Sequence, residues 1–109
     1  MTESEFLALA ESTLSDIEQA FDRLFEQDIV DVECKRSGNV LEIEFVDNGS
    51  KIIVNSQAPM QELWVAAKAG GFHFRHDGGK WVDTRGGAEL YAALSQYMSQ
   101  QAGVALALK

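Results

Sequence analysis

Two stretches of the chain repeat apolar residues at three- and four-residue steps, which is the spacing of an amphipathic helix. The first covers residues 3–26, where no glycine or proline interrupts the pattern, and its apolar stripe consists of Phe6, Leu9, Ala10, Thr13, Leu14, Ile17, Ala20, Phe21 and Leu24. The second covers residues 87–101, and its stripe consists of Leu90, Ala93, Leu94, Tyr97 and Met98. The pattern predicts a helix near each end of the chain. The apolar tail at 102–109 is expected to pack against the rest.

Between the predicted helices the hydrophobic period changes to two, which is typical of half-buried strands. Valines and Cys34 alternate with charged residues over 30–35, and apolar residues alternate with glutamates over 41–45. Further strands are predicted at 52–54, 63–67, 72–75 and 80–82. Turns rich in glycine and asparagine separate several of these strands and indicate hairpins, so neighbouring strands are expected to run antiparallel.

The order of predicted elements is one helix, five or six strands and a second helix. Each helix has a single apolar stripe and the sheet has at least one apolar face, so the economical packing places both helices on the same sheet face. The expected fold is α+β: a two-layer α/β sandwich with two helices on one face of an antiparallel five- to six-stranded sheet. With 109 residues, the chain is expected to form a single domain over 1–109, and the other sheet face is then exposed.

Acidic residues are concentrated in the first third of the chain. The sequence carries 17 acids and 9 bases, a formal net charge of −8. Residues 1–34 hold ten acids and one base, giving −9, whereas residues 35–109 hold seven acids and eight bases, giving +1. Such a surface repels phosphate backbones, which argues against a nucleic-acid partner, and it attracts cations or a basic protein.

Nothing in the sequence indicates export or a membrane. The chain starts with an acidic segment rather than a basic and apolar signal, and no apolar run approaches the roughly 18 residues of a spanning helix. The single cysteine, Cys34, cannot form an internal disulfide, which suits a reducing compartment. The sequence therefore predicts a cytoplasmic protein with no membrane partner.

The acids of the first helix fall along one edge. At the angular step of an α-helix, four of them lie within about 80° of one another, away from the apolar stripe: Glu11, Glu18, Asp22 and Glu26. Three more continue the run toward the first strand: Asp28, Asp31 and Glu33. Asp31 and Glu33 are expected on one side of that strand, opposite Val32 and Cys34. We call these seven residues the acidic ridge.

A solvated helix face is the simplest interpretation of such a run, but the arrangement costs stability. Glu18 and Asp22, and likewise Asp22 and Glu26, are like-charge pairs four residues apart, each destabilising by roughly 0.2–0.5 kcal/mol. A functional use would explain that cost. Carboxylates without His or Cys are hard oxygen ligands that suit Fe, Mn, Mg or Ca, and on an open surface they bind weakly because the ion keeps its water. A basic protein is the other candidate ligand.

A second pattern involves a turn, a tryptophan and a glycine pair. An Asn-x-Gln-x-Pro turn is followed by a tryptophan five residues after the proline and by a glycine pair before an aromatic strand: Asn55, Gln57, Pro59, Trp64, Gly70 and Gly71. Trp81 and the segment 84–87 precede the second helix in a matching way. In spacing and order these residues resemble the frataxin family, and its bacterial members in particular, over about residues 3–101. The resemblance also implies an α/β sandwich.

The resemblance implies an iron-binding accessory or regulatory protein of iron–sulfur cluster assembly. Such a protein binds Fe²⁺ or Fe³⁺ weakly and exchangeably on an acidic ridge, where other hard divalent or trivalent cations could substitute. It docks on the cysteine desulfurase, and the cluster scaffold protein is a further candidate partner. The residues that carry over as iron ligands are Glu18, Asp22, Asp31 and Glu33, with Glu11, Glu26 and Asp28 as neighbours. The residues that carry over as partner contacts are Asn55, Gln57 and Trp64 on the sheet, with Glu18 and Asp22 on the ridge.

Two other functions stay open at this stage. One is an iron-oxidising, iron-storing oligomer, to which a ferroxidase-like activity would belong, and the other is an acidic protein-binding inhibitor without a metal role. No nucleophile–base–acid set stands out, and the carboxylates lie on an exposed ridge rather than in an apolar pocket that could raise a pKa. The sequence therefore does not predict an ordinary enzyme.

The remaining residues with functional potential have simpler interpretations. Trp64 is expected to be partly exposed on the open sheet face, with a core position as the alternative, whereas Trp81 is expected to pack. His73 and His76 are three residues apart on a predicted strand, so they point to opposite faces and cannot form a joint metal pair. Cys34 lies on the core side of its strand, where a thiol is usually inert.

Overall fold

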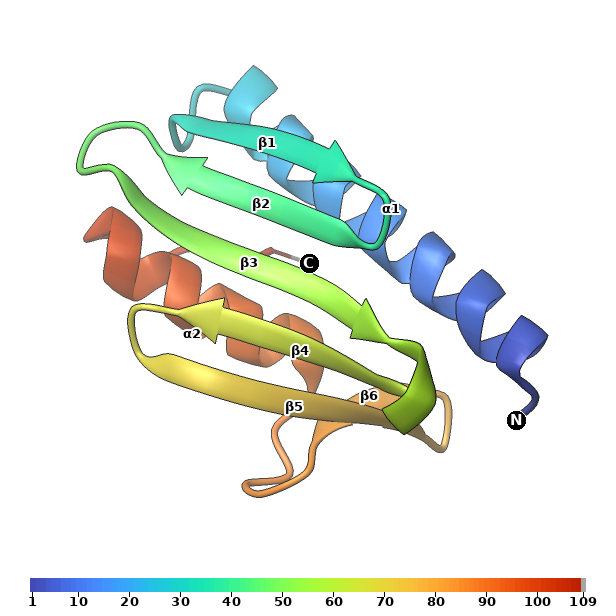
Figure 1. The fold of residues 1–109 in the computed structure, drawn as a ribbon. Helices are drawn as coiled ribbons and strands as arrows, with labels where there is room; N and C mark the ends of the chain where they lie inside the picture. The colour runs from blue at the N-terminus through green and yellow to red at the C-terminus, as the bar shows by residue number, and fades with distance from the viewer. Residues whose placement is uncertain (109) are drawn as a thin grey trace.

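The computed structural model describes residues 1–108, so Lys109, the last residue of the predicted tail, lies outside it. Along the chain the elements are α1 (Glu3–Glu26), β1 (Val32–Ser37), β2 (Val40–Phe45), β3 (Ser50–Gln57), the 3₁₀ turn η1 (Ala58–Met60), β4 (Glu62–Ala67), β5 (Gly70–Asp77), β6 (Lys80–Asp83) and α2 (Leu90–Ala102). The six strands form one antiparallel sheet in sequence order. Both helices cover the same sheet face (Figure 1), which confirms the predicted two-layer sandwich.

Local capping defines the start and the end of α1. Thr2 and Glu5 form a capping box, in which the Thr2 hydroxyl accepts from the Glu5 amide at 3.1 Å and the Thr2 amide donates to the Glu5 carboxylate at 2.8 Å. At the other end Asp28 adopts a left-handed conformation with φ 60°, and the Ile29 amide donates back to the carbonyl of Leu24 at 2.9 Å. The chain therefore leaves the helix in a tight turn and enters β1 beside it.

The core lies between the helices and one face of the sheet. Its largest fully buried side chains come from both helices and from all but the outermost strands: Phe6, Leu14, Ile17, Phe21, Leu41, Ile43, Ile52, Leu63, Phe74, Leu90, Leu94 and Met98. Trp81 of β6 packs there as predicted, with its indole N–H donating to the Thr13 hydroxyl of α1 at 3.1 Å. No helix within residues 1–108 is long and apolar enough to cross a membrane.

The second helix begins three residues later than its hydrophobic pattern predicts. Gly87 has φ 76° and the Asp83 amide donates to the Ala88 carbonyl at 2.8 Å, so this segment is a loop. Glu89 is extended and acts as the N-cap, with its carboxylate accepting from the amides of Tyr91 at 2.8 Å and Ala92 at 3.2 Å. A capping glutamate therefore sets the boundary that periodicity alone placed too early.

The chain after α2 folds back along that helix, and this confirms the prediction that the tail packs against the rest of the protein. Gly103 ends the helix with φ 78°, the left-handed conformation that glycine adopts without strain. The Leu106 amide then donates to the Ser99 hydroxyl and the Leu108 amide to the Ser95 hydroxyl, both at 2.8 Å. Leu108 is only 5% exposed and belongs to the hydrophobic core.

Candidate functional site

The acidic ridge follows the outer edge of the molecule, where α1 lies beside β1 (Figure 1). Glu18 is half-buried, and the other six ridge residues are exposed: Glu11, Asp22, Glu26, Asp28, Asp31 and Glu33. The only base in the first third of the chain, Arg23, also lies exposed on α1. The ridge is therefore a largely solvent-facing run of carboxylates, with Arg23 as the one base on its helix.

The pKa of the Cys34 thiol on β1 is affected by the ridge carboxylates on α1. The pKa of its thiol is raised to about 12, mainly by burial and further by the negative charges of Asp22 and Glu18. The charges of those two α1 carboxylates therefore act on the same residue of β1. The core-side position of Cys34 agrees with the prediction, and a thiol with so high a pKa is a poor nucleophile.

The ridge does not gather its carboxylates into a metal cluster. Within residues 1–108, no three His, Cys, Asp or Glu side chains converge closely enough to hold a metal ion. Glu11 is engaged by the guanidinium of Arg36, which reaches it from β1. Asp31 precedes β1, which begins at Val32, so the expectation that Asp31 shares that strand is wrong. Asp31 instead accepts a hydrogen bond from the Val46 amide through its backbone carbonyl at 3.1 Å.

The donor set of the ridge nevertheless suits a hard cation. All seven side chains offer carboxylate oxygens, which are the ligands that iron and other hard cations accept. Since they lie in a line rather than around a point, an ion there would contact few of them at once and keep most of its water. Among residues 1–108 these carboxylates do not form an enclosed site for an ion.

The open face of the sheet carries the second set of predicted residues. In the β3–β4–β5 register Asn55 lies opposite Trp64, and Trp64 lies opposite His73. Two residues further along the strands, Gln57 lies opposite Glu62, and Glu62 lies opposite Arg75. Trp64 is half-buried on this face while its neighbours Leu63 and Val65 are in the core, which confirms the predicted orientation.

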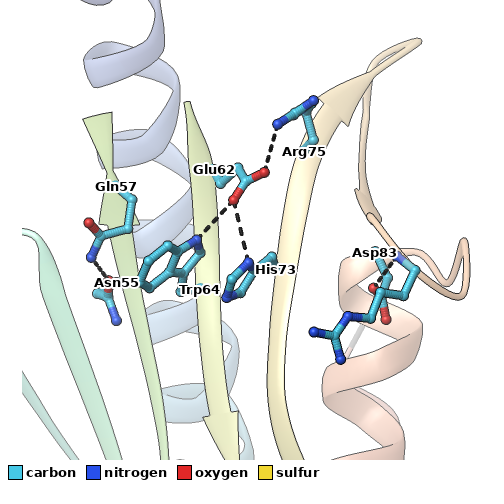
Figure 2. Close-up of polar contacts among 8 residues, drawn as sticks. Asn55, Gln57, Glu62, Trp64, His73, Arg75 and Asp83 are labelled. Carbon is cyan, nitrogen blue, oxygen red and sulfur yellow. Dashed lines mark hydrogen bonds and ion pairs between the residues drawn. The ribbon is translucent and has the colours of Figure 1, made fainter. Parts of the chain in front are cut away.

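Asn55 and Gln57 interact with each other on this face. The Gln57 side-chain amide donates to the Asn55 side-chain oxygen at 2.6 Å, and both residues are half-buried beside the indole of Trp64 (Figure 2). Within residues 1–108, neither side chain bonds to the backbone of the turn before Pro59. They line one flank of Trp64.

The other flank contains residues that the sequence analysis did not identify. The carboxylate of Glu62 accepts from the Trp64 indole N–H at 3.0 Å and from Arg75 Nη2 at 2.8 Å, and it lies 3.6 Å from His73 Nδ1 (Figure 2). The ring of His73 stacks on the indole of Trp64, with centroids 4.3 Å apart and planes 7° apart. The strand was predicted to begin at residue 63, whereas β4 begins at Glu62, so no sheet face had been assigned to this glutamate.

The two histidines lie on opposite sheet faces, as predicted. His73 is exposed on the open face against Trp64, whereas His76 is half-buried and packs edge-on against Trp81 with ring centroids 5.2 Å apart. A joint metal site for this pair would need both rings on one side of β5, so the geometry excludes it.

The structure therefore defines an α/β sandwich with a carboxylate ridge at one edge and a tryptophan-centred surface on its open face. The frataxin-like domain model matches residues 1–104. The iron–sulfur cluster assembly protein CyaY of Cupriavidus metallidurans is 71% identical over 109 residues, covering 100% of this chain and 97% of that protein. Its counterpart in Janthinobacterium sp. (strain Marseille) is 65% identical over 109 residues, with the same coverage.

Solved structures agree with the sequence comparison. Frataxin from Psychromonas ingrahamii superimposes with a TM-score of 0.82 at 31% identity, covering 100% of this chain and 99% of that one. A ferrous complex of trimeric frataxin from the yeast Saccharomyces cerevisiae has a TM-score of 0.73 at 23% identity, covering 94% and 88%, and at that identity it supports the fold alone. The chain belongs to the frataxin family, as a bacterial protein of the CyaY type.

Proposed function

We propose that this protein is an iron-binding accessory or regulatory protein of iron–sulfur cluster assembly, acting as one domain in the cytoplasm rather than as an enzyme. Relatives at 71% and 65% identity carry the name iron–sulfur cluster assembly protein CyaY. The observation that carries the proposal is the acidic ridge, which keeps like charges adjacent on α1, a helix whose one base is Arg23. Repulsion between these like charges destabilises the helix, and binding of a cation or a basic partner would relieve that repulsion.

Iron binding is assigned to the segment of the ridge where α1 meets β1. Glu18 and Asp22, from adjacent turns of α1, both carry charges that raise the pKa of the Cys34 thiol on β1. Glu33 follows on β1, and Asp31 precedes it. These hard oxygen donors would bind Fe²⁺ or Fe³⁺ as exchangeable cargo, and other hard cations would compete for them.

Partner docking is assigned to two surfaces. Glu18 and Asp22 of the ridge would meet a basic patch on the cysteine desulfurase, because long-range attraction between opposite charges accelerates and orients association. Asn55, Gln57 and Trp64 on the open sheet face would provide a second contact, to the desulfurase or the cluster scaffold protein. A half-buried tryptophan flanked by polar groups is the kind of residue that anchors an interface.

An anaerobic Fe²⁺ titration followed by ¹H–¹⁵N NMR tests the iron site. Amides around Glu18 and Asp22 should broaden at low Fe²⁺ while those of Asn55 and Trp64 stay sharp. Asp22→Asn should weaken the response, and the matched control is Asp16→Asn, which removes an exposed α1 carboxylate that is not part of the ridge. The iron assignment fails if no amide responds or if the two α1 variants behave alike.

A further inference from the structure

Glu62 is unusually buried for a charged residue on the open face of the sheet. It alternates with Leu63, so its side chain leaves β4 on the face that the helices do not cover, yet that side chain is only 5% exposed. A buried carboxylate is costly unless it is paired and hydrogen-bonded. The neighbouring side chains must therefore enclose it and satisfy it.

Both oxygens of Glu62 are used. Oε1 accepts from the Trp64 indole N–H at 3.0 Å and lies 3.6 Å from His73 Nδ1, while Oε2 accepts from Arg75 Nη2 at 2.8 Å (Figure 2). One carboxylate thus connects a residue two positions along its own strand to two residues of β5. The His73 ring completes the arrangement by stacking on the indole.

This network fixes the orientation of the tryptophan. The hydrogen bond to Glu62 determines which way the indole N–H points, and the stack with His73, at an interplanar angle of 7°, determines the plane of the ring. A side chain that is already ordered loses little conformational entropy when a partner binds, which raises affinity without any added contact. Arg75 is held by the same carboxylate but stays 60% exposed, so it remains open to solvent.

We propose that Glu62 is a positioning residue: it holds Trp64 in the orientation that a protein partner meets on this face, without itself contacting that partner. This inference rests on the proposed function, in which Trp64 is a contact residue. Because the Glu62 side chain is only 5% exposed, its effect on binding acts through the indole that it orients. Replacing Glu62 should then weaken docking only in a protein that still carries Trp64.

The test is a double-mutant cycle on affinity for the purified cysteine desulfurase with its scaffold protein, measured by calorimetry. Trp64→Ala should lower the affinity about tenfold, as expected of an interface anchor, and Glu62→Ala should lower it several-fold. The double variant should bind no more weakly than Trp64→Ala alone, because residues that act as a unit are not additive. Glu44→Gln, which alters a carboxylate on β2 of the same sheet, is the matched control and should bind like the unmodified protein.

A spectroscopic measurement separates positioning from a loss of folding. The Trp64 indole N–H resonance should shift upfield and exchange faster with water in Glu62→Ala, because its acceptor is gone. Glu62→Gln keeps an oxygen acceptor for the indole, so that resonance should stay near its original position and most of the lost affinity should return. Unchanged amide spectra elsewhere in both variants would show that the fold is intact.

Two results would overturn the inference in distinguishable ways. If Trp64→Ala binds normally, the proposed contact surface is wrong and the inference falls with it. If Trp64→Ala binds weakly but Glu62→Ala binds normally despite a shifted indole resonance, the contact surface stands and only the positioning role is rejected. Additive losses in the double variant would likewise reject it, because they would mean that Glu62 meets the partner directly.

Discussion

The buried side chain of Gln101, near the end of α2, donates to the backbone carbonyl of Lys51 in β3 at 3.1 Å. The same amide nitrogen donates to the Ser50 hydroxyl at 3.0 Å, and the side-chain oxygen accepts from the backbone amide of Lys68 at 3.0 Å. One glutamine therefore joins the helix to the start of β3 and to the turn between β4 and β5.

Replacing Gln101 by Leu should destabilise the fold. The change removes all three hydrogen bonds and leaves backbone groups without partners, a loss of roughly 1–3 kcal/mol in the free energy of unfolding. Urea denaturation followed by circular dichroism measures it. The neighbouring Gln100 is exposed, so Gln100→Leu is the control and should change stability by less than about 0.5 kcal/mol. Equal effects of the two variants would contradict the role assigned to Gln101.

The acidic ridge should show a conflict between stability and docking at Asp22. Asp22→Lys converts two repulsive four-residue pairs with Glu18 and Glu26 into attractive ones and places a cation near the helix C-terminus, so the free energy of unfolding should rise by roughly 0.5–1 kcal/mol. The same variant should bind the cysteine desulfurase more weakly, and the remaining affinity should depend less on salt. A pulldown at increasing NaCl together with a melting curve measures both. Docking that is unchanged by Asp22→Lys would exclude this part of the ridge as the docking surface.

Stability should fall at alkaline pH because of Cys34. Its folded-state pKa is raised from 9.0 to about 12, so between those values the folded protein holds a proton that the unfolded chain has released. The unfolded state then binds fewer protons, and the free energy of unfolding decreases as pH rises through this window. Cys34→Ser removes the titrating thiol and should flatten this decrease in urea titrations at several pH values. An identical pH profile for both proteins would show that burial does not hold the thiol protonated.

Reactivity offers an independent check on the same residue. At pH 8 the native thiol should react with a thiol reagent such as iodoacetamide far more slowly than the urea-unfolded chain, because little thiolate is present. Asp22→Asn removes one of the charges that raise the pKa and should speed the native reaction slightly. Native and unfolded chains that react equally fast would contradict the assigned environment of Cys34.

The tail should contribute substantially to stability through Leu108. Leu108→Ala empties a nearly enclosed position in the core and should lower the free energy of unfolding by about 2–3 kcal/mol. Val104 lies in the same tail but is 55% exposed, so Val104→Ala is the control and should cost little. Thermal unfolding by calorimetry compares the two. If Leu108→Ala melts like the unmodified protein, the tail is not part of the cooperative core.

Most of the fold could be predicted from the sequence because apolar and polar residues follow a clear helical or strand period in the core elements. The apolar stripe of α1 and the period-two strands match the buried residues, and both helices lie on one sheet face. The start of α2 was placed too early, since the choice between loop and helix there depends on the capping carboxylate of Glu89. Hydrophobic periodicity shows which face of a helix is apolar. It does not show which side chain accepts hydrogen bonds from the free amides of the first turn, and that side chain fixes where the helix begins.

The candidate site was only partly predictable for a related reason. Charge and helical spacing identified the ridge, but whether its carboxylates converge depends on how α1 lies against β1, which periodicity does not specify. Arg75 was not identified because a charged residue on the open sheet face is normally solvated, and Glu62 was not identified because the predicted strand began one residue after it. Its burial follows from the register that brings β5 beside it, and register is a property of strand pairing rather than of one strand.

The strand order has a consequence for assembly with other proteins. β1, at the ridge, and β4, which carries Trp64, are separated by three strand spacings, or roughly 14 Å across a sheet whose hydrogen bonds keep that span fixed. A complex that contacts both regions therefore holds its two partner surfaces at a fixed distance from each other. Once one region is bound, the second encounters its partner at a high effective concentration. Two weak contacts then give a higher overall affinity while each stays reversible.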